Sequence, residues 1–208
     1  MNNKKVLLAV ALVFVLVLGG AYVLYDRLGQ EMKPDQLVAS QPQSTSSALA
    51  EEASEQPAGD GHNHAEGEEV YHAPDVTLYN ESGETVQLSD YFGKPIVLNF
   101  WASWCGPCQS EMPDFNEKYL EIGDDVHFLM VNLTDGSRET IETATAFIDK
   151  NGYAFPVFYD TTGEAATAYA AYSLPTTYFI DAYGHAVAQA IGAIDMATLE
   201  QGLSMIGR

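Results

Sequence analysis

The chain has 208 residues and a formal net charge of −20 at pH 7, from 29 acidic and 9 basic side chains. This length allows one domain with appended segments. The negative charge excludes nucleic acid as a partner, because phosphate binding needs clustered Lys and Arg. Solubility through self-repulsion accounts for the charge, and a partner with a basic surface is the alternative.

The N-terminal segment has the pattern of a membrane anchor. Residues 1–5 include two lysines, residues 6–25 hold no charged side chain, and Asp26 and Arg27 follow. About 20 apolar residues are enough to cross a bilayer as a helix. The lysines predict that residues 1–5 are cytoplasmic and that the rest of the chain is extracytoplasmic. A cleavable signal peptide that ends near residues 19–21 is the alternative.

Residues 26–70 form a predicted acidic linker in which Ser, Gln, Glu, Ala and Pro dominate. Such a stretch buries too little apolar surface to offset the entropy of ordering it, so we expect a disordered tether. Its His62 and His64 lie among carboxylates, and both residue types bind metals. A solvated acidic spacer is the competing interpretation, because nothing in the pattern fixes a ligand geometry.

From residue 71 onward, strand and helix patterns alternate. Apolar runs predict buried strands, apolar residues at helical spacing predict helices, and turn residues at 81–83 predict a hairpin. The predicted elements are a hairpin at 76–79 and 85–88, a helical turn at 89–93, strands at 95–101, 126–133, 155–159, 176–180 and 186–191, and helices at 109–122, 139–150, 164–172 and 198–206. Their order predicts an α/β domain over residues 71–208.

The two cysteines of the chain, Cys105 and Cys108, lie at the junction of a predicted strand and a predicted helix. Two cysteines at this spacing are typical of a redox couple. The free N–H groups and the partial positive charge of a helix start favour a thiolate, so Cys105 is the predicted nucleophile. Cys108 lies one turn later and is the predicted resolving thiol. Gly106 leaves the approach to Cys105 open, and Pro107 suits the first helical turn.

An inert disulfide clip and a zinc site are the alternatives for the cysteine pair. A clip that encloses so few residues gains little from chain entropy. A zinc site needs two further Cys or His ligands at suitable spacing, and the predicted domain offers none. We therefore expect no metal and no cofactor other than the Cys105–Cys108 couple itself.

Aromatic and acidic side chains flank the motif. Trp101 is expected in the core, whereas Trp104 is expected to be exposed beside Cys105 as a substrate contact. Glu111 follows Cys108 by one helical turn and shares its helix face. It either exchanges protons with the buried thiol or is a solvated helix carboxylate.

Two blocks of sequence resemble the thioredoxin superfamily and, more closely, its membrane-anchored TlpA/ResA-type thiol-disulfide oxidoreductases. The resemblance covers residues 71–208. It implies a thioredoxin-like fold, with a central mixed sheet flanked by helices, an N-terminal hairpin, and an inserted helix and strand at about 135–159. The residues that carry it are 99–113, 174–181, Gly184 and Gly192.

The resemblance also implies roles that spacing alone does not show. Pro175 stands at a strand entrance, where an ordinary turn proline is allowed, but the family has a cis-proline across from the cysteine pair. The backbone of Leu174 is then expected to pair with a bound substrate chain, next to Thr176. Glu111 matches a family carboxylate near the buried cysteine. Asn99 replaces the buried Asp of cytosolic thioredoxins, which makes Glu111 the stronger candidate for proton transfer.

These features predict an extracytoplasmic, membrane-anchored protein-disulfide reductase that acts as a monomer. Its expected substrates are protein disulfides, such as those of apo-cytochrome c or envelope proteins, and its expected electron donor is a CcdA- or DsbD-type membrane protein. The predicted catalytic residues are Cys105, Cys108, Glu111 and Pro175, and the predicted substrate contacts are Trp104, Gly106, Pro107, Leu174 and Thr176.

Two alternative functions stay open. A disulfide-introducing oxidase would need a much less negative potential than the value of about −270 mV that is typical of reducing thioredoxins, whose Gly-Pro pair this motif shares. A non-catalytic metal-delivery or chaperone protein is the other alternative. Copper-delivery relatives usually separate their cysteines by three residues, so the spacing of two weighs against that function.

Overall fold

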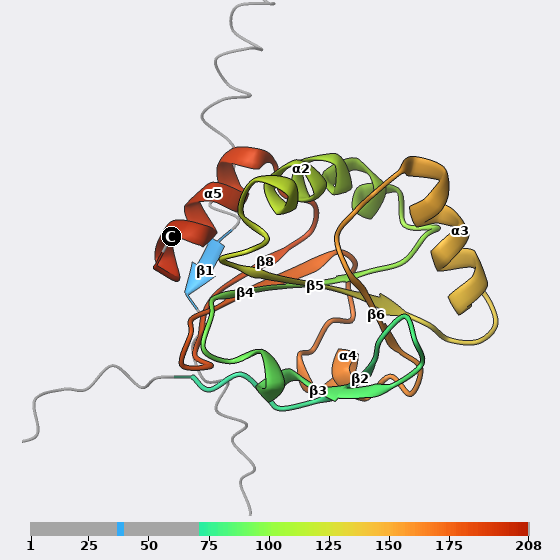
Figure 1. Ribbon diagram of the computed structural model, residues 1–208, viewed down its shortest axis with the longest axis horizontal. Coiled ribbons are helices and arrows are strands. Elements are labelled where there is room, and N and C mark those ends of the chain that lie inside the picture. The colour runs from blue at the N-terminus through green and yellow to red at the C-terminus, as the bar shows by residue number, and fades with distance from the viewer. Residues whose placement is uncertain (1–36, 40–70, 208) are drawn as a thin grey trace, which may run out of the picture. The chain divides into compact units, whose positions relative to one another are not determined.

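The computed structural model describes residues 37–39 and 71–207 (Figure 1). In this part of the chain, eight strands form one sheet in the order β1-β8-β7-β4-β5-β6-β2-β3. The strands are β1 (Leu37–Ala39), β2 (Thr77–Tyr79), β3 (Thr85–Gln87), β4 (Ile96–Trp101), β5 (His127–Leu133), β6 (Val157–Asp160), β7 (Thr176–Ile180) and β8 (Ala186–Ile191). The helices are the 3₁₀ helix η1 (Leu88–Tyr91) and the α-helices α2 (Gly106–Ile122), α3 (Ile141–Asn151), α4 (Glu164–Ala168) and α5 (Met196–Met205).

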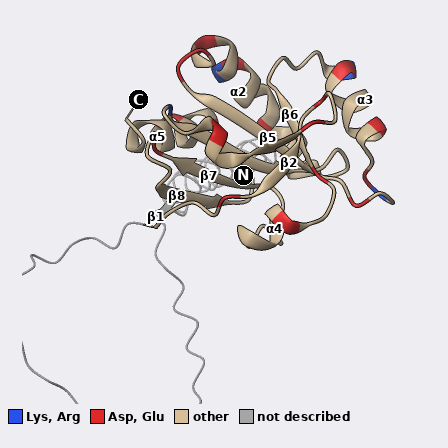
Figure 2. Cartoon of the chain, turned by 60° about the horizontal axis from the view of Figure 1, so that its bottom comes forward, with Lys and Arg blue, Asp and Glu red and all other residues tan. Residues whose placement is uncertain are grey.

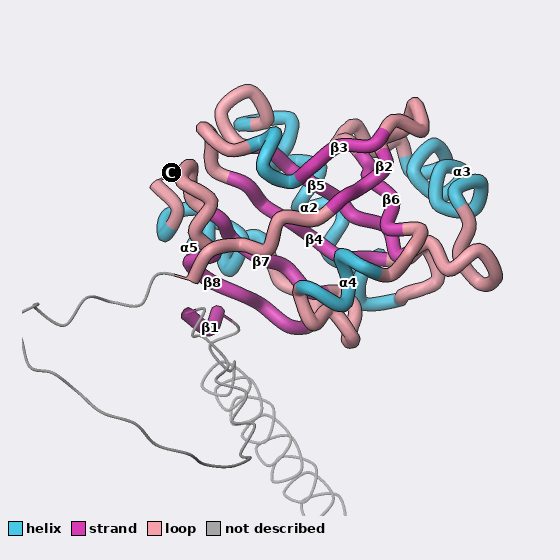
Figure 3. Tube along the Cα trace, turned by 90° about the horizontal axis from the view of Figure 1, so that it is seen from below, coloured by secondary structure: helices cyan, strands magenta, loops and turns pink. Residues whose placement is uncertain are grey.

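The sheet is mixed and is covered on both faces. Strand β4 pairs in parallel with β5 and antiparallel with β7. Helices α2, α3 and α5 cover one face, and η1 and α4 lie on the other (Figures 1 and 3). Because side chains alternate along a strand, Val97 and Trp101 join the core beneath α2, whereas Leu98 and Phe100 join the core on the η1 and α4 side.

The predicted elements of the domain are confirmed in type and order. Strands β7 and β8 have the predicted bounds, and the predicted thioredoxin-like architecture, with its hairpin and the α3–β6 pair, is present. All four α-helices differ from their predicted bounds: α3 begins two residues later and ends one residue later, and α5 begins two residues earlier and ends one residue earlier. Helix α2 begins three residues earlier than expected, because Cys105 caps it, and α4 ends four residues early at Ala168. The backbone of Ala170 has a left-handed φ of 48°, which a continued helix does not allow.

The prediction of a continuous linker over residues 26–70 is wrong at one place. Residues Leu37–Ala39 form β1, which pairs antiparallel with β8, from Leu37 opposite Ala190 to Ala39 opposite Ala188. The free edge of β8 offers backbone hydrogen-bond partners, and Leu37 packs against the core. The other residues of this predicted linker lie outside the described residues.

The predicted membrane span at residues 6–25 also lies outside the described residues. Within 37–39 and 71–207, no helix is both long and apolar enough to cross a membrane. Acidic residues are spread over the helices and loops of the domain, with few basic residues among them (Figure 2).

The packing of α5 on the sheet yields a test of the core. A Cβ added at Gly202 would overlap the ring of Phe179 in β7, and that ring is completely buried. We expect Gly202→Ala to lower the free energy of unfolding by about 1–3 kcal/mol, because overpacking outweighs the better helix propensity of Ala. Urea unfolding measures this change. Ser204→Ala, on the exposed face of α5, is the control and should stay within about 0.5 kcal/mol; a more stable Gly202→Ala protein would contradict the packing.

Candidate active site

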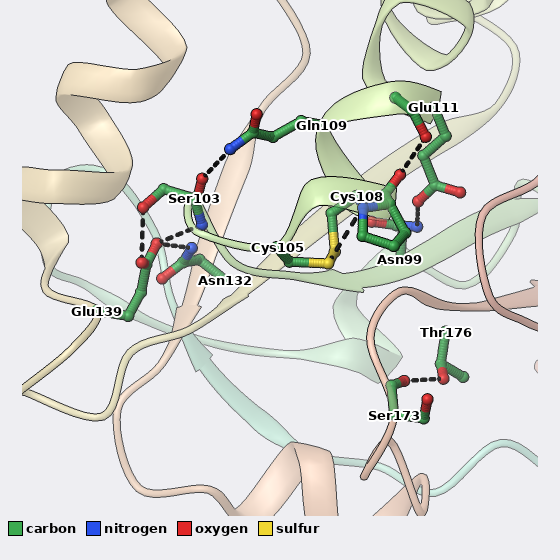
Figure 4. Close-up of a disulfide and its surroundings, with 12 residues drawn as sticks. Asn99, Ser103, Cys105, Cys108, Gln109, Glu111, Asn132, Glu139, Ser173 and Thr176 are labelled. Carbon is green, nitrogen blue, oxygen red and sulfur yellow. Dashed lines mark hydrogen bonds between the residues drawn. A yellow bond between two sulfur atoms is a disulfide. The ribbon is translucent and has the colours of Figure 1, made fainter.

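The two cysteines form a disulfide at the start of α2, with their Cα atoms 5.2 Å apart (Figure 4). Cys105 is the N-cap of the helix, and its Sγ accepts a hydrogen bond of 3.2 Å from the backbone N–H of Cys108. Cys105 keeps 5% of its surface exposed, whereas Cys108 is completely buried. Cys105 is therefore the more exposed cysteine of the pair, as expected, and the helix start directs an N–H group at its sulfur.

Glu111 is buried one helical turn after Cys108 and is not a solvated helix carboxylate. Its two oxygens accept hydrogen bonds from Asn99 Nδ2 at 2.8 Å and from the backbone N–H of Ile194 at 3.0 Å. Burial raises the pKa of Glu111 from its ordinary value of 4.5 to about 8, and these two hydrogen bonds only partly oppose the shift. Glu111 is therefore mostly protonated at neutral pH while the cysteines form the disulfide.

Asn99 links this carboxyl group to the neighbouring strand. Its Nδ2 also donates to Thr177 Oγ1 at 2.9 Å, and its Oδ1 has no hydrogen-bond partner in the described part of the protein. The side chain of Asn99 is completely buried. An amide carries no proton that it can give up at neutral pH, so Glu111 is the titratable group at this position.

The peptide bond between Leu174 and Pro175 is cis, as the family resemblance implies. Thr176 pairs with Phe100 near the carboxyl end of β4, which places Pro175 at the same end of the sheet as Cys105. No hydrogen bond within the described residues engages the backbone of Leu174. The side chain of Thr176 is buried and donates to the carbonyl of Ser173 at 2.7 Å, so it does not face solvent.

The chain neighbours of Cys105 on both sides are exposed. Trp104 is exposed as predicted, with 43% of its surface accessible, and Trp101 is fully buried. Gly106 and Pro107 are exposed at the first turn of α2, and a Cβ added at Gly106 would meet no neighbour within 4 Å. The surface beside Cys105 is therefore formed by the Trp104 indole ring and by the exposed first turn of α2, where Gly106 has no side chain.

Sequence reasoning missed two residues of this region, Arg138 and Glu139. The Glu139 carboxylate is buried and bonded to Ser103, and the Arg138 guanidinium lies 3.6 Å from the centre of the Trp104 ring. Both contacts join positions more than 30 residues apart in a loop without a recognisable motif. The one available signal was a basic and an acidic residue at the start of the predicted helix at 139–150, and such residues are usually solvated.

No group of three or more potential metal ligands occurs among residues 37–39 and 71–207. The candidate ligands His62 and His64 lie outside the described residues. The disulfide with its buried carboxyl group is thus the chemistry that this region offers.

Comparison with known proteins agrees with this site. The model of the AhpC/TSA family matches residues 71–189. The chain belongs to the AhpC/TSA family. With a thioredoxin-like fold and the Cys105–Cys108 pair, this member of the family is a thiol-disulfide oxidoreductase of the ResA type.

Named relatives of this AhpC/TSA family member come from several bacteria. The chain is 40% identical over 139 residues to the thiol-disulfide oxidoreductase ResA of Oceanobacillus iheyensis, a match that covers 64% of this chain and 70% of that protein. It is 36% identical to the thioredoxin-like protein YneN of Bacillus subtilis, over 66% of this chain and 80% of YneN. The crystal structure of an exposed lipoprotein thioredoxin from Streptococcus pneumoniae is 36% identical and covers 63% of this chain and 98% of that structure, with a TM-score of 0.54.

The raised pKa of Glu111 predicts a pH-dependent stability. Between about pH 4.5 and pH 8 the folded, oxidised protein retains a proton that the unfolded chain has released, so its stability falls as the pH rises. The loss over this window should reach several kcal/mol, since each pKa unit corresponds to about 1.4 kcal/mol. Urea unfolding of the oxidised protein from pH 4 to pH 9 measures it.

Glu111→Gln removes the titrating group and should flatten the curve between pH 4.5 and pH 8. Glu117→Gln is the matched control, because Glu117 is an exposed carboxylate on the same helix. Parallel curves for the wild type and Glu111→Gln would contradict the raised pKa of Glu111.

Proposed function

We propose that this thiol-disulfide oxidoreductase is a reductase of protein disulfides, held on the outer face of the cytoplasmic membrane. One observation carries the proposal: the slightly exposed Cys105 at the N-cap of α2 is bonded to a completely buried Cys108, and the buried carboxyl group of Glu111 lies one turn further along the helix. This arrangement supports attack on the substrate by Cys105, resolution of the mixed disulfide by Cys108, and proton transfer to Glu111.

The first step is attack by the reduced enzyme. The Cys105 thiolate, which the helix start and the Cys108 N–H favour, displaces one sulfur of the substrate disulfide. A bond forms between Cys105 and the substrate, the substrate S–S bond breaks, and one substrate thiolate leaves and is protonated by solvent. Cys108 is buried and unable to meet a protein substrate directly, so the attack falls to Cys105.

The second step resolves the mixed disulfide. The Cys108 thiol transfers its proton to the Glu111 carboxylate and attacks Cys105 Sγ, and the second substrate sulfur leaves as a thiolate. The enzyme ends with the Cys105–Cys108 disulfide and a protonated Glu111, the form that a pKa of about 8 favours at neutral pH. A dithiol donor then returns two electrons, and Glu111 gives its proton back to Cys108.

The burial of Cys108 supports the reducing direction. Burial disfavours a thiolate, so the dithiol form lacks the stabilisation that an ionised thiol gives to strong oxidants, and it gives up its electrons more readily. The Gly106-Pro107 pair adds to this argument, because it matches that of reducing thioredoxins. An oxidase would instead need a stabilised dithiol form.

The Pro175 segment supports a polypeptide as substrate. The backbone of Leu174 carries no hydrogen bond within the described residues and adjoins the cis-proline at the Cys105 end of the sheet. An extended substrate chain pairing with this backbone would lie next to the sulfur. Trp104, Gly106 and Pro107 would contact the same chain, and Thr176 would contribute through its backbone.

The cellular setting follows from the sequence of the N-terminal segment. A span at residues 6–25 would hold the domain outside the cytoplasm, where disulfides persist and where a reductase needs electrons delivered across the membrane. A CcdA- or DsbD-type membrane protein would supply them. Substrates such as apo-cytochrome c or envelope proteins fit this setting, and the enzyme would work as a monomer.

Substitution of each cysteine tests the assigned roles. We expect Cys105→Ser to abolish insulin reduction in the presence of dithiothreitol, because the attacking sulfur is lost. Cys108→Ser should accumulate a mixed disulfide with insulin that is visible on a non-reducing gel. Ser110→Ala, on the exposed face of the same helix turn, is the control and should retain activity. Full activity in Cys105→Ser would refute the assignment.

The midpoint potential tests the direction. Equilibration with glutathione or dithiothreitol buffers, followed by thiol alkylation, should give a value near about −270 mV, as for reducing thioredoxins. A value near about −120 mV, as in strong oxidants, would favour the disulfide-introducing oxidase instead.

A further inference from the structure

Hydrogen bonds within the loop between β5 and α3 hold it in a tight turn. Asp135 Oδ1 accepts the backbone N–H of Ser137 at 2.7 Å and that of Glu139 at 3.0 Å, and the Gly136 N–H donates to the Glu139 carbonyl at 2.9 Å. Gly136 has a φ of 71°, which suits the turn. These bonds place Arg138 and Glu139, which are adjacent in the chain, beside residues 103–105, the active-site segment that leads into α2.

Glu139 is a completely buried carboxylate that the disulfide chemistry does not use. Its Oε1 accepts the Ser103 N–H at 2.9 Å and Asn132 Nδ2 at 2.7 Å, and its Oε2 accepts the Ser103 hydroxyl at 2.7 Å (Figure 4). Asn132 is itself held by the hydroxyl of Thr134. Every donor that faces the carboxylate is thus paired, as a buried polar network requires.

Ser103 is fixed from three sides by these contacts. Besides its two bonds to Glu139, its carbonyl accepts Gln109 Nε2 at 2.6 Å. Ser103 precedes Trp104 and lies two residues before Cys105, so its position determines where the segment enters α2. The carboxylate therefore acts on the reactive sulfur through the backbone that carries it.

Arg138 holds the next residue along the segment. Its guanidinium carbon lies over the Trp104 ring, 3.6 Å from the ring centre, in a cation–π contact. Arg138 is exposed and is one of the few basic residues in the domain (Figure 2). Two adjacent loop residues thus hold two adjacent active-site residues, Glu139 from the buried side and Arg138 at the surface.

We propose that Thr134–Glu139 is a positioning loop for polypeptide substrates, in which Glu139 fixes Ser103 and Arg138 holds the Trp104 ring as a flat docking surface beside Cys105. The inference rests on the proposed reductase function and names its substrate-facing element. A polypeptide that brings its disulfide to Cys105 must cover the neighbouring indole, whereas a small disulfide need not. The two loop residues therefore have separable effects.

The experiment compares single-turnover oxidation of the pre-reduced protein by insulin and by hydroxyethyl disulfide, a small uncharged disulfide, with quenching by acid and alkylation of the remaining thiols. Arg138→Ala should lower the second-order rate constant with insulin about tenfold and change that with hydroxyethyl disulfide less than about twofold. Lys150→Ala removes one positive charge from the exposed end of α3 and should leave both rate constants unchanged.

Glu139 should affect both substrates. Glu139→Ala leaves buried donors unpaired and should lower both rate constants about tenfold. Glu139→Gln should retain most of the rate, because its amide oxygen can accept the Ser103 N–H and Asn132 while its amide nitrogen donates to the Ser103 hydroxyl. If Glu139→Ala does not fold, Ser103→Ala, which removes one of the three bonds, should show a smaller loss on both substrates.

Acrylamide quenching of tryptophan fluorescence gives a second measurement that does not depend on activity. The chain has two tryptophans and Trp101 is fully buried, so quenching reports on Trp104. Arg138→Ala should increase quenching in the same redox state, and Lys150→Ala should not.

Unchanged quenching, or an unchanged ratio of the insulin and hydroxyethyl disulfide rate constants in Arg138→Ala, would overturn the proposed loop. Wild-type rates in Glu139→Ala would overturn the role of Glu139. A wild-type protein that reduces neither disulfide would instead contradict the reductase function, and the quenching result would still decide whether Arg138 positions Trp104.

Discussion

The burial of β4 in the middle of the sheet is the constraint on which the active site depends. All six residues of this strand are buried, and it is hydrogen-bonded to β5 on one side and to β7 on the other. A strand held in this way has a fixed carboxyl end. Cys105 follows the last residue of β4 by four positions and caps α2. The buried strand therefore fixes the position of the reactive sulfur.

The buried carboxyl group of Glu111 is the second feature on which the site depends. Cys108 belongs to the apolar core beneath α2, and Glu111 enters the same region from the next helical turn. Two hydrogen bonds are too few to replace the lost hydration of a carboxylate, so the neutral acid dominates near pH 7. In the proposed mechanism, proton transfer to and from Cys108 would therefore take place away from water, with Glu111 as the partner.

The elements and the cysteine pair were predictable because they depend on local signals. Buried strands and helices leave apolar patterns, and the spacing of Cys105 and Cys108 is visible in the chain itself. The cis bond at Pro175 was not predictable from its residues, since most X-Pro bonds are trans, and only the family resemblance implied it. Strand β1 has three residues and depends on the exposed edge of β8, so composition alone placed it in a linker. The contact of Glu139 with Ser103 joins residues 36 positions apart, and no local pattern encodes it.

The disulfide encloses only Gly106 and Pro107 within one turn at the start of α2. Opening it adds little conformational freedom to the unfolded chain, because the entropic effect of a cross-link grows with the length of the loop it closes and this loop is very short. Among the described residues, the sheet and the helices that cover it are held by strand pairing and by two apolar cores that extend far from this bond. We therefore expect the domain to stay folded when this bond opens and closes, so that electron transfer needs no unfolding step.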